Sequence, residues 1–337
     1  MPNQKVLLAE SDSKAASAMA KDLRGKGYEV FTTSDAIHTL STARSQQPDV
    51  IVLSGALAGG GALAALQRVR SNVYTANIPV IALVGKKGAK LAELANGGAQ
   101  ACLTIPVEFK DLKAAIDKNL LQELDFTQAP AEVIKEPERM KALKATKLLD
   151  SPPEASFDRA TRLISRLLGA PTALVTLVDK DRQFFKSQVG LGDPWARTRQ
   201  TDLNHSFCQW VVSGREPVVV NDATEHPVLK NNLAIKHLNV IAYAGVPLYA
   251  RDGQPIGSIC AIDSSPRQWS DRAVATLMDI AQVAEGYAVD DPKAAAHAVR
   301  AVAGILRRFG DKLTHEDRED LACILEEKSD KLVQKAR

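Results

Sequence analysis

Two carboxylates near the start of the chain are the first side chains whose spacing suggests chemistry. Glu10 and Asp12 flank Ser11 directly after the apolar run Val6–Ala9. Converging carboxylate oxygens bind a hard cation such as Mg²⁺, and a bound cation can support phosphoryl transfer. Such a cation needs several oxygens, so a lone pair binds it poorly. Both residues also suit a strand end beside a helix N-terminus, where negative charge is favourable.

A second group of candidate residues lies in three segments of the chain's second half. They are Phe207, Cys208 and Trp210 in HSFCQWVV, Asp222 and His226 in NDATEHP, and Tyr243 in AYAGVPL. Aromatic walls with a few polar groups are the usual make-up of a ligand cleft, so we treat these six as a candidate pocket. Phe207 and Tyr243 are more typical of a protein core than of a ligand contact, and NDATEHP equally suits a turn that bonds its own backbone.

The cysteines provide a third possible chemistry. Cys102, Cys208, Cys260 and Cys323 show no CxxC spacing and no paired histidines, which argues against a disulfide framework or a zinc site. We expect reduced thiols that are mostly buried. A redox pair of Cys208 with Cys260 stays an alternative, although His205 is the one nearby group in the sequence that could lower a thiol pKa.

The bulk composition indicates a folded protein without a nucleic-acid or membrane partner. The 337 residues favour two domains, with 45% hydrophobic and 25% charged residues and a formal net charge of +3. Binding to phosphates would require a clear basic excess. No apolar stretch is long enough for a membrane span, and the chain starts directly with a strand pattern, so we predict a cytoplasmic location.

The first part of the chain predicts an α/β domain. Short apolar runs alternate with amphipathic helical stretches, and the runs VIVL and PVIALV suit strands that are buried on both sides. The predicted strands are 6–9, 29–32, 50–53, 79–84 and 101–104, with a first helix at 15–26 and a closing helix at 109–121. This alternation predicts a parallel sheet covered on both faces by helices.

The second part predicts an antiparallel sheet with helices. The polar, proline-bearing stretch 125–137 reads as a linker, which gives a first domain at 1–124 and a second at 138–289. Asp179–Asp181 and the Asp-Gly turn at Arg251–Gln254 each join two strand patterns as a hairpin. A final helix of this domain starts near Ser270 and continues toward Tyr287.

The tail at 290–337 predicts a two-helix hairpin. Apolar residues recur at helical spacing on both sides of Gly310, and Thr314 with Asp317 resembles a capping box. Its charges nearly cancel, so we expect a packing or partner-binding element and not a nucleic-acid arm.

The segments KVLLAESD, PDVIVLSGAL, IPVIALVG and ACLTIPVEF, in this order, resemble the landmarks of a response-regulator receiver domain. The resemblance implies a doubly wound, five-stranded, flavodoxin-like parallel sheet. It also places Ser54 at the phosphoacceptor aspartate, Val84 at the Thr/Ser position and Ile105 at the lysine, while Ser11 falls at the main metal position. We therefore predict a degenerate pseudo-receiver, with phosphorylation of Ser54 itself, or a metal held by Glu10 and Asp12, as the alternatives.

The segments from Arg139 to Tyr287 resemble a bacterial subgroup of GAF domains, notably TALVTLVDKDRQFFKS and IAYAGVPLYARDGQPIGSICAID. The resemblance implies an antiparallel sheet with helices, dimerisation through helices, and a pocket. Members bind cyclic nucleotides, tetrapyrroles, small metabolites or nothing known. Gln209 stands where a bilin-attaching domain has histidine after the cysteine, and the NKxxxxxFxxxDE pattern of cyclic-nucleotide binders is absent.

Catalytic motifs are absent from the sequence, including the Walker loop, HExxH, GxSxG and GGDEF-like patterns. We predict no enzyme, no cofactor and no metal. The leading interpretation is a signalling adaptor whose partners are signalling proteins such as a histidine kinase; the alternative is a small-molecule sensor. A homodimer through helices 139–149 and 270–287 is expected, with the apolar stripe Met140, Leu143 and Leu148 as a compatible surface.

Overall fold

The computed structural model describes residues 4–55, 57–85, 89–120, 127–288 and 292–336. The chain divides into two compact units, Met1–Phe126 (unit 1) and Thr127–Arg337 (unit 2). The division falls inside the segment for which a linker is predicted. Part of that segment forms a short helix, α6 (Ala131–Ile134), in which Ile134 is buried.

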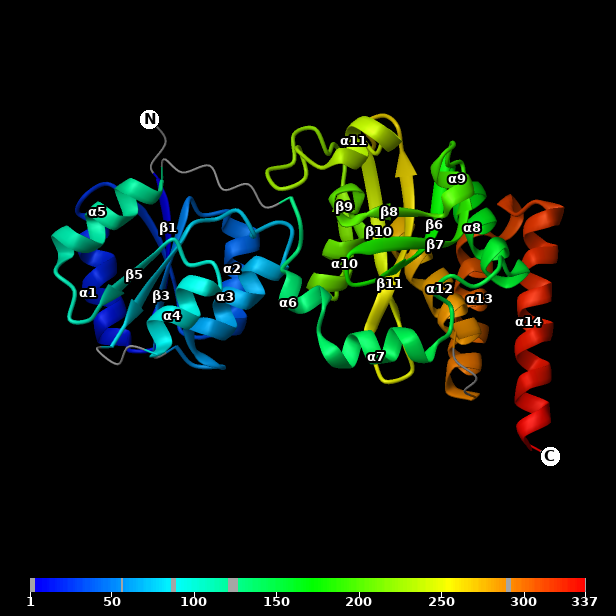
Figure 1. The fold of residues 1–337 in the computed structure, drawn as a ribbon, viewed down its shortest axis with the longest axis horizontal. Coiled ribbons are helices and arrows are strands. Elements are labelled where there is room, and N and C mark those ends of the chain that lie inside the picture. Colours follow the sequence, from blue (N-terminus) through cyan, green and yellow to red (C-terminus); the bar gives the residue numbers. More distant parts are fainter. Residues whose placement is uncertain (1–3, 56, 86–88, 121–126, 289–291, 337) are drawn as a thin grey trace. The chain divides into compact units, whose positions relative to one another are not determined.

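Unit 1 contains the predicted parallel sheet with helices on both faces (Figure 1). The strand order β2-β1-β3-β4-β5 is that of flavodoxin-like doubly wound folds. The strands are β1 (Lys5–Ala9), β2 (Glu29–Thr33), β3 (Val50–Ser54), β4 (Val80–Val84) and β5 (Ala101–Thr104). The helices are α1 (Ser13–Arg24), α2 (Ala36–Gln46), α3 (Gly61–Ser71), α4 (Ala89–Asn96) and α5 (Phe109–Asn119).

Two apolar layers hold the helices of unit 1 on its sheet. On one face, Leu23 of α1 and Ile116 of α5 pack against alternate residues of the central strands, such as Val52. On the other face, Leu66 of α3 packs against the intervening residues, such as Ile51. Alternation of side chains along each strand therefore explains why the central strands are apolar on both faces.

Unit 2 contains a six-stranded antiparallel sheet in the order β8-β7-β6-β11-β10-β9. Its strands are β6 (Thr172–Val178), β7 (Arg182–Val189), β8 (Gln200–Asp202), β9 (Val218–Val220), β10 (Ala242–Tyr249) and β11 (Pro255–Asp263). Both predicted hairpins form, since β6 pairs with β7 and β10 pairs with β11. The remaining elements are α7 (Pro137–Ala145), α8 (Ala155–Leu168), α9 (Trp195–Thr198), η1 (Leu203–His205), α10 (Cys208–Gly214), α11 (Leu233–Leu238) and α12 (Asp271–Ala288).

The two faces of this sheet have different coverings. Side chains such as Val175, Ala244 and Ile259 face the main apolar core, which α8 and α12 complete. On the opposite face, the short helix α10 packs on β6, β10 and β11. The alternate residues of these strands therefore look toward α10, and these include Thr176, Tyr243 and Cys260.

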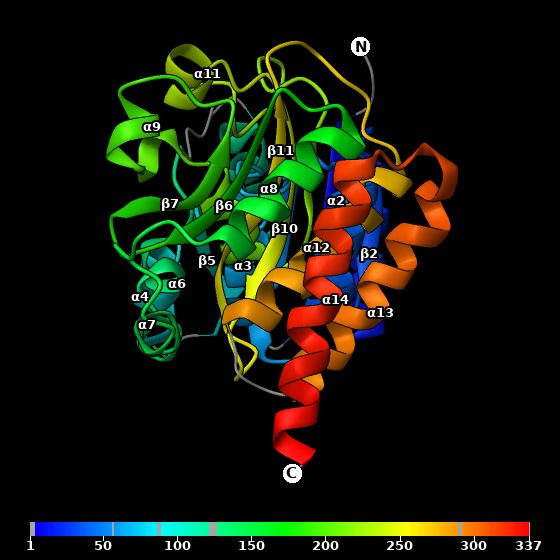
Figure 2. The same cartoon turned by 90° about the vertical axis from the view of Figure 1, so that its right-hand side faces the viewer.

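The tail forms the predicted helical hairpin, and it packs on the helical face of unit 2 (Figure 2). Its helices are α13 (Pro292–Phe309) and α14 (His315–Ala336), joined through η2 (Gly310–Lys312). Val302 and Ile305 of α13 and Ile324 of α14 belong to the same core as α8 and α12. The hairpin is therefore an integral layer of the described fold of unit 2.

The predicted apolar stripe on α7 is used within the chain. Leu143 is fully buried and Leu148 is 7% exposed, both in the main core of unit 2, and Met140 packs against that core. The reason is that α7 turns its apolar side toward β11. Leu143 and Leu148 are therefore not available to a partner subunit in this fold.

Candidate functional site

The carboxylates after β1 support the local backbone. Asp12 caps α1, with Oδ1 accepting the N–H groups of Lys14 at 2.8 Å and Ala15 at 3.0 Å. Glu10 accepts the N–H of Asp12 at 2.8 Å. Backbone N–H groups at a helix start would otherwise lack partners, so these bonds stabilise the turn into α1. Both carboxylates are thus in the structural role that suits a strand end.

Ser11 joins three segments at the same edge of the sheet. Its hydroxyl donates to the Ser34 carbonyl at 2.9 Å and accepts the N–H of Ala58 at 2.8 Å. This serine therefore links the ends of β1 and β2 to the loop that follows β3. A carboxylate at position 11 could accept the second bond but could not donate the first.

The three remaining positions of the candidate receiver site lie at the carboxyl ends of neighbouring strands. Ser54 ends β3 and is 3% exposed, Val84 ends β4 and is 1% exposed, and Ile105 follows β5 at 40% exposed. Val84 belongs to the apolar layer that α2, α3 and α4 cover. Phosphoryl transfer to the Ser54 hydroxyl would need a base and a cation, and the apolar side chains of Val84 and Ile105 supply neither.

A polar hollow lies beside this edge. Its volume is about 530 Å³, and its lining comes from the end of β1, the start of α1, the end of β2 and α2, including Glu10, Ser34, His38 and Thr42. Among the described residues, no group of three or more His, Cys, Asp and Glu side chains gathers to hold a metal ion. Hydroxyls dominate the lining, so the hollow suits hydrogen bonding and not metal coordination.

In unit 2, the structure brings Cys208 and Tyr243 of the candidate pocket into direct contact. The Tyr243 hydroxyl lies 3.4 Å from Cys208 Sγ and 3.2 Å from Ser258 Oγ. Cys260 lies on the same face of the sheet, directly opposite Gly245, and the Tyr243 hydroxyl lies over that glycine. Each of these four side chains is at most 3% exposed. We call Cys208, Tyr243, Ser258 and Cys260 the thiol cluster.

Aromatic side chains close the space around the thiol cluster. The Phe207 and Tyr243 rings lie 5.4 Å apart and tilted by 55°. Tyr243 folds over Gly245, where an added Cβ would lie 2.1 Å from the tyrosine oxygen. Phe207 and Trp210 are 3% and 1% exposed. The candidate pocket is therefore filled by the protein's own side chains, and a ligand would have to displace them.

Buried polar atoms without a hydrogen-bond partner among the described residues occur on the strands of this face and on α10. One is the Thr176 hydroxyl on β6, whose residue pairs with Ser258 in the sheet register, and another is Trp210 Nε1 on α10. Both residues are at most 1% exposed. A buried polar group without a partner is rare and costs about 1–3 kcal/mol, so this face has unused hydrogen-bonding capacity.

The surroundings shift the pKa values of the two cysteines in opposite directions. Hydrogen bonds to Cys208, first from the Cys260 thiol and also from the Tyr243 hydroxyl, outweigh burial and lower the pKa of Cys208 below its ordinary value. Burial raises the pKa of Cys260 and of Tyr243 well above their ordinary values. Cys208 is therefore the thiolate-forming member and Cys260 the protonated donor.

Asp222 and His226 serve the loop after β9. Asp222 accepts the N–H of Thr224 at 2.9 Å and its hydroxyl at 2.6 Å, which is an Asx turn. His226 Nδ1 accepts the N–H groups of Val228 at 3.2 Å and Leu229 at 3.3 Å. Burial lowers the pKa of His226 to about 4, so the ring is neutral at physiological pH. These bonds give both residues the turn role that the sequence also allowed.

Sequence reasoning missed two buried cations of unit 2. Lys186 is 1% exposed, and its ammonium donates to Ser151 Oγ at 2.5 Å and the Pro152 carbonyl at 2.8 Å and pairs with Glu154. Arg139 is fully buried and donates to the carbonyls of Ile134 and Val178. A lysine in the apolar strand pattern RQFFKSQV was the one signal for the first of these.

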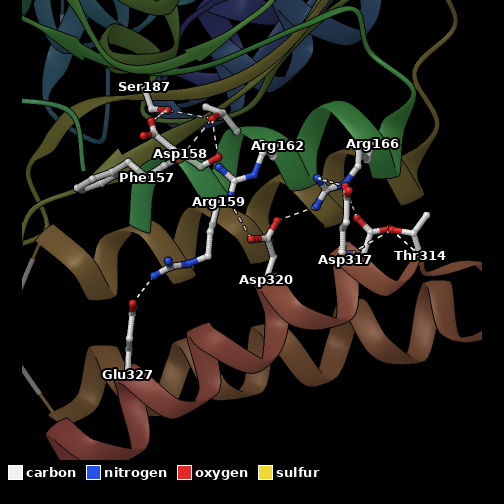
Figure 3. Close-up of polar contacts among 12 residues, drawn as sticks. Phe157, Asp158, Arg159, Arg162, Arg166, Ser187, Thr314, Asp317, Asp320 and Glu327 are labelled. Carbon is white, nitrogen blue, oxygen red and sulfur yellow. Dashed lines mark hydrogen bonds and ion pairs between the residues drawn. The ribbon is translucent and has the colours of Figure 1, made fainter. Parts of the chain in front are cut away.

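Sequence reasoning also missed a row of ion pairs between α8 and α14 (Figure 3). Arg166 donates to Asp317 at 2.6 Å and to Asp320 at 2.7 Å, and Arg162 donates to Asp320 at 2.9 Å. Arg159 pairs with Glu327 further along α14. The arginines occupy one face of α8, so together they bind the acidic side of the tail helix.

Comparisons with known proteins fit these two folds. Residues 152–286 match the GAF domain family. The chain is 31% identical over 138 residues to a cyclic di-GMP phosphodiesterase, PA2567 of Pseudomonas aeruginosa, covering 40% of this chain and 23% of that protein. It is 30% identical over 95 residues to the probable transcriptional regulatory protein TcrX of Mycobacterium tuberculosis, covering 28% and 40%. The chain thus spans less than half the length of either relative.

Solved structures similar to this chain include two that are described as response-regulator or receiver proteins. One is a putative response regulator from Chloroflexus aurantiacus, with 23% identity, 36% of this chain and 99% of that chain covered, and a TM-score of 0.34. The other is the receiver domain of the sensor histidine kinase PA1611 from Pseudomonas aeruginosa, with 21% identity, the same coverage and a TM-score of 0.34.

The folds and the family match define the class. The chain is a signalling protein that combines a receiver-like α/β domain with a second domain built on an antiparallel sheet. That second domain, at residues 152–286, is a GAF domain. No helix among the described residues is both long and apolar enough to cross a bilayer.

Proposed function

We propose that this protein is a non-catalytic signalling adaptor of the cytoplasm, with a pseudo-receiver that docks partners independently of phosphorylation. The proposal rests on the residues at the carboxyl ends of β3, β4 and β5. Ser54 stands at the acceptor position, with Val84 and Ile105 in place of the hydroxyl and the lysine. Phosphoryl transfer requires a cation, an acceptor and a phosphate-holding group, and the companion positions supply none of these.

The polar residues that remain at this edge support the same proposal. Asp12 caps α1, Glu10 accepts the N–H of Asp12, and Ser11 links three segments. Replacing a metal site with such bonds keeps the strand ends in place without a bound ion. The partners we propose are signalling proteins, among them a histidine kinase or another regulator, and we propose a homodimer through the GAF domain. We assign no catalytic activity, because the sequence carries no catalytic motif of the kinds considered above.

A phosphorylation assay tests the pseudo-receiver. The full-length protein is incubated with acetyl phosphate and Mg²⁺, beside a receiver domain that retains its aspartate, and both are measured by intact-protein mass spectrometry. We expect phosphate on the control domain alone. Phosphate on Ser54 that disappears in Ser54→Ala, together with lost signalling in that variant, would overturn the proposal.

A small-molecule sensor is the second candidate, and the unpartnered polar atoms favour it. The Thr176 hydroxyl and Trp210 Nε1 are buried without partners, so a ligand that bonds them would remove an unfavourable state. Native mass spectrometry of protein purified gently from its own host separates the candidates. A stoichiometric extra mass that is lost in Tyr243→Leu would favour the sensor hypothesis. A ligand-free protein would favour the adaptor hypothesis. Cyclic di-GMP is one compound to try, since a relative's name contains it.

A further inference from the structure

The thiol cluster contains two buried cysteines, Cys208 and Cys260, that the proposed adaptor function does not use. They come from distant segments, one at the start of α10 and one inside β11, and are buried on the same face of the sheet beside the Tyr243 hydroxyl. From this arrangement we propose that Cys208 and Cys260 form a reversible disulfide when the protein meets a hydroperoxide, and that this disulfide links α10 to the sheet as a redox input.

The sheet register places both sulfurs at one point. Cys260 lies directly opposite Gly245 in the antiparallel pair of β11 and β10. The Tyr243 hydroxyl lies over that same glycine, because a Cβ there would be 2.1 Å away, and it is 3.4 Å from Cys208 Sγ. Directly opposite residues in an antiparallel pair have their Cβ positions about 5 Å apart. The Tyr243 oxygen thus lies beside the Cys208 sulfur and over the glycine that faces Cys260 across the strand pair.

The surrounding hydroxyls suit a peroxide as the oxidant. Tyr243 and Ser258 can donate hydrogen bonds to the Cys208 sulfur or to an oxygen beside it. The Thr176 hydroxyl, opposite Ser258 in the register, has no partner among the described residues and is free to bond a peroxide oxygen. Both oxygens of hydrogen peroxide accept and donate hydrogen bonds, so a hydroxyl-lined site complements it.

The chemistry balances with hydrogen peroxide as the two-electron oxidant. The Cys208 thiolate attacks one peroxide oxygen, the O–O bond breaks, and the leaving hydroxide takes a proton to become water, which leaves a sulfenic acid on Cys208. The Cys260 sulfur then attacks the sulfenic sulfur, the S–O bond breaks, and the departing oxygen leaves as a second water after taking the thiol proton. The net change is two thiols and one peroxide to one disulfide and two waters.

Burial makes this step selective. Cys208 is 3% exposed and Cys260 is fully buried, so bulky thiol reagents do not reach them in the native state. Hydrogen peroxide is close to water in size and enters through local openings of the native structure. The exposed Cys323 and the partly buried Cys102 lie outside the cluster and serve as controls within the same chain.

Peptide mapping of the full-length protein tests the proposal. The protein is treated with hydrogen peroxide, denatured, alkylated with N-ethylmaleimide and digested without reductant. We expect a cross-linked peptide that joins Cys208 to Cys260 and disappears after dithiothreitol, with no disulfide from Cys102. The proposal is overturned if Cys208 and Cys260 both remain fully alkylated under conditions that oxidise Cys323. A disulfide between either residue and another cysteine would also overturn it.

Two variants assign the roles, with circular dichroism to verify the fold. In Cys260→Ser, Cys208 should stop at the sulfenic acid and become labelled by dimedone. In Cys208→Ser, Cys260 should remain a free thiol. The assigned roles, with Cys208 reacting first and Cys260 second, would be refuted by one result. In that result, dimedone labels Cys260 in Cys208→Ser as fast as it labels Cys208 in Cys260→Ser. The mapping of the unaltered protein decides the proposal even where a variant fails to fold.

Discussion

Replacing Asp317 with alanine should loosen the tail hairpin by an amount that the structure defines. Asp317 is 3% exposed at its side chain and accepts Arg166 Nε at 2.6 Å, the Thr314 N–H at 2.9 Å and the Thr314 hydroxyl at 2.8 Å. Losing the Asp317 side of the reciprocal cap costs up to about 1 kcal/mol, since the Asp317 N–H keeps its bond to the Thr314 hydroxyl. Losing a charged hydrogen bond costs about 1.5–3 kcal/mol, and Arg166 keeps Asp320 as a partner. We expect a total of about 2–4 kcal/mol.

Glu316→Ala is the matched control, because the side chain is adjacent and pairs with the same arginine. Glu316 is 74% exposed and lies 3.4 Å from Arg166, so its loss should cost about 0.5 kcal/mol or less. Intrinsic fluorescence is a suitable assay in the full chain, since all three tryptophans, at positions 195, 210 and 269, belong to unit 2. Urea denaturation followed by tryptophan emission therefore reports unit 2 alone.

The pH dependence gives an independent measurement of the same contact. Burial raises the pKa of Asp317, but the bonds from Arg166 and Thr314 outweigh it and leave the pKa below its ordinary value. The contribution of Asp317 is therefore present above the unfolded pKa of about 4 and is lost as the pH falls through the lower folded value. The stability difference between the unaltered protein and Asp317→Ala should shrink in that acid range. Equal losses from Asp317→Ala and Glu316→Ala at neutral pH would refute the reasoning.

Three further changes should alter the stability of unit 2 in the same urea assay. Burial raises the pKa of Glu285 to about 7, so the folded state loses up to about 3 kcal/mol of stability as the pH rises from about 4.5 to 7. Glu285→Gln should remove this decline. An unchanged dependence of stability on pH in that variant would contradict the role of Glu285. Gly245→Ala should destabilise by about 1–3 kcal/mol through its clash with Tyr243, and less so in a Tyr243→Ala background; additive losses would contradict the contact. Lys186→Met should cost about 1–3 kcal/mol, because the Pro152 carbonyl loses its donor, and a neutral result would mean that water replaces the ammonium.

The fold was predictable where a local pattern determines the structure. The runs VIVL and PVIALV form β3 and β4, which are fully buried, because a parallel sheet covered on both faces requires apolar residues at every position. The Asp-Gly turn and the cap formed by Thr314 with Asp317 are local as well. Such signals depend on neighbouring residues and are therefore readable from the sequence.

The candidate site was predictable in part, because its contacts join distant segments. The short helix beginning at Cys208 and the strand containing Tyr243 were each recognised, but their contact depends on how α10 packs on the sheet. The ion pairs of α8 with α14 join residues about 150 positions apart, and the only signal for them was the near cancellation of charge within the tail. A lysine in a strand pattern likewise does not reveal that its ammonium returns to the loop at Ser151.

The proposed loss of phosphorylation chemistry is physically compatible with a stable fold. Several carboxylates that converge at one strand edge repel each other unless a cation neutralises them, so an active receiver site keeps a local electrostatic cost. Ser11, which the receiver resemblance places at the main metal position, forms two hydrogen bonds here, and Val84 adds to an apolar layer. If the site is a pseudo-receiver, returning a carboxylate at Ser11 should lower the stability of unit 1 in metal-free buffer, because the Ser34 carbonyl loses its donor and charge is added beside Glu10 and Asp12.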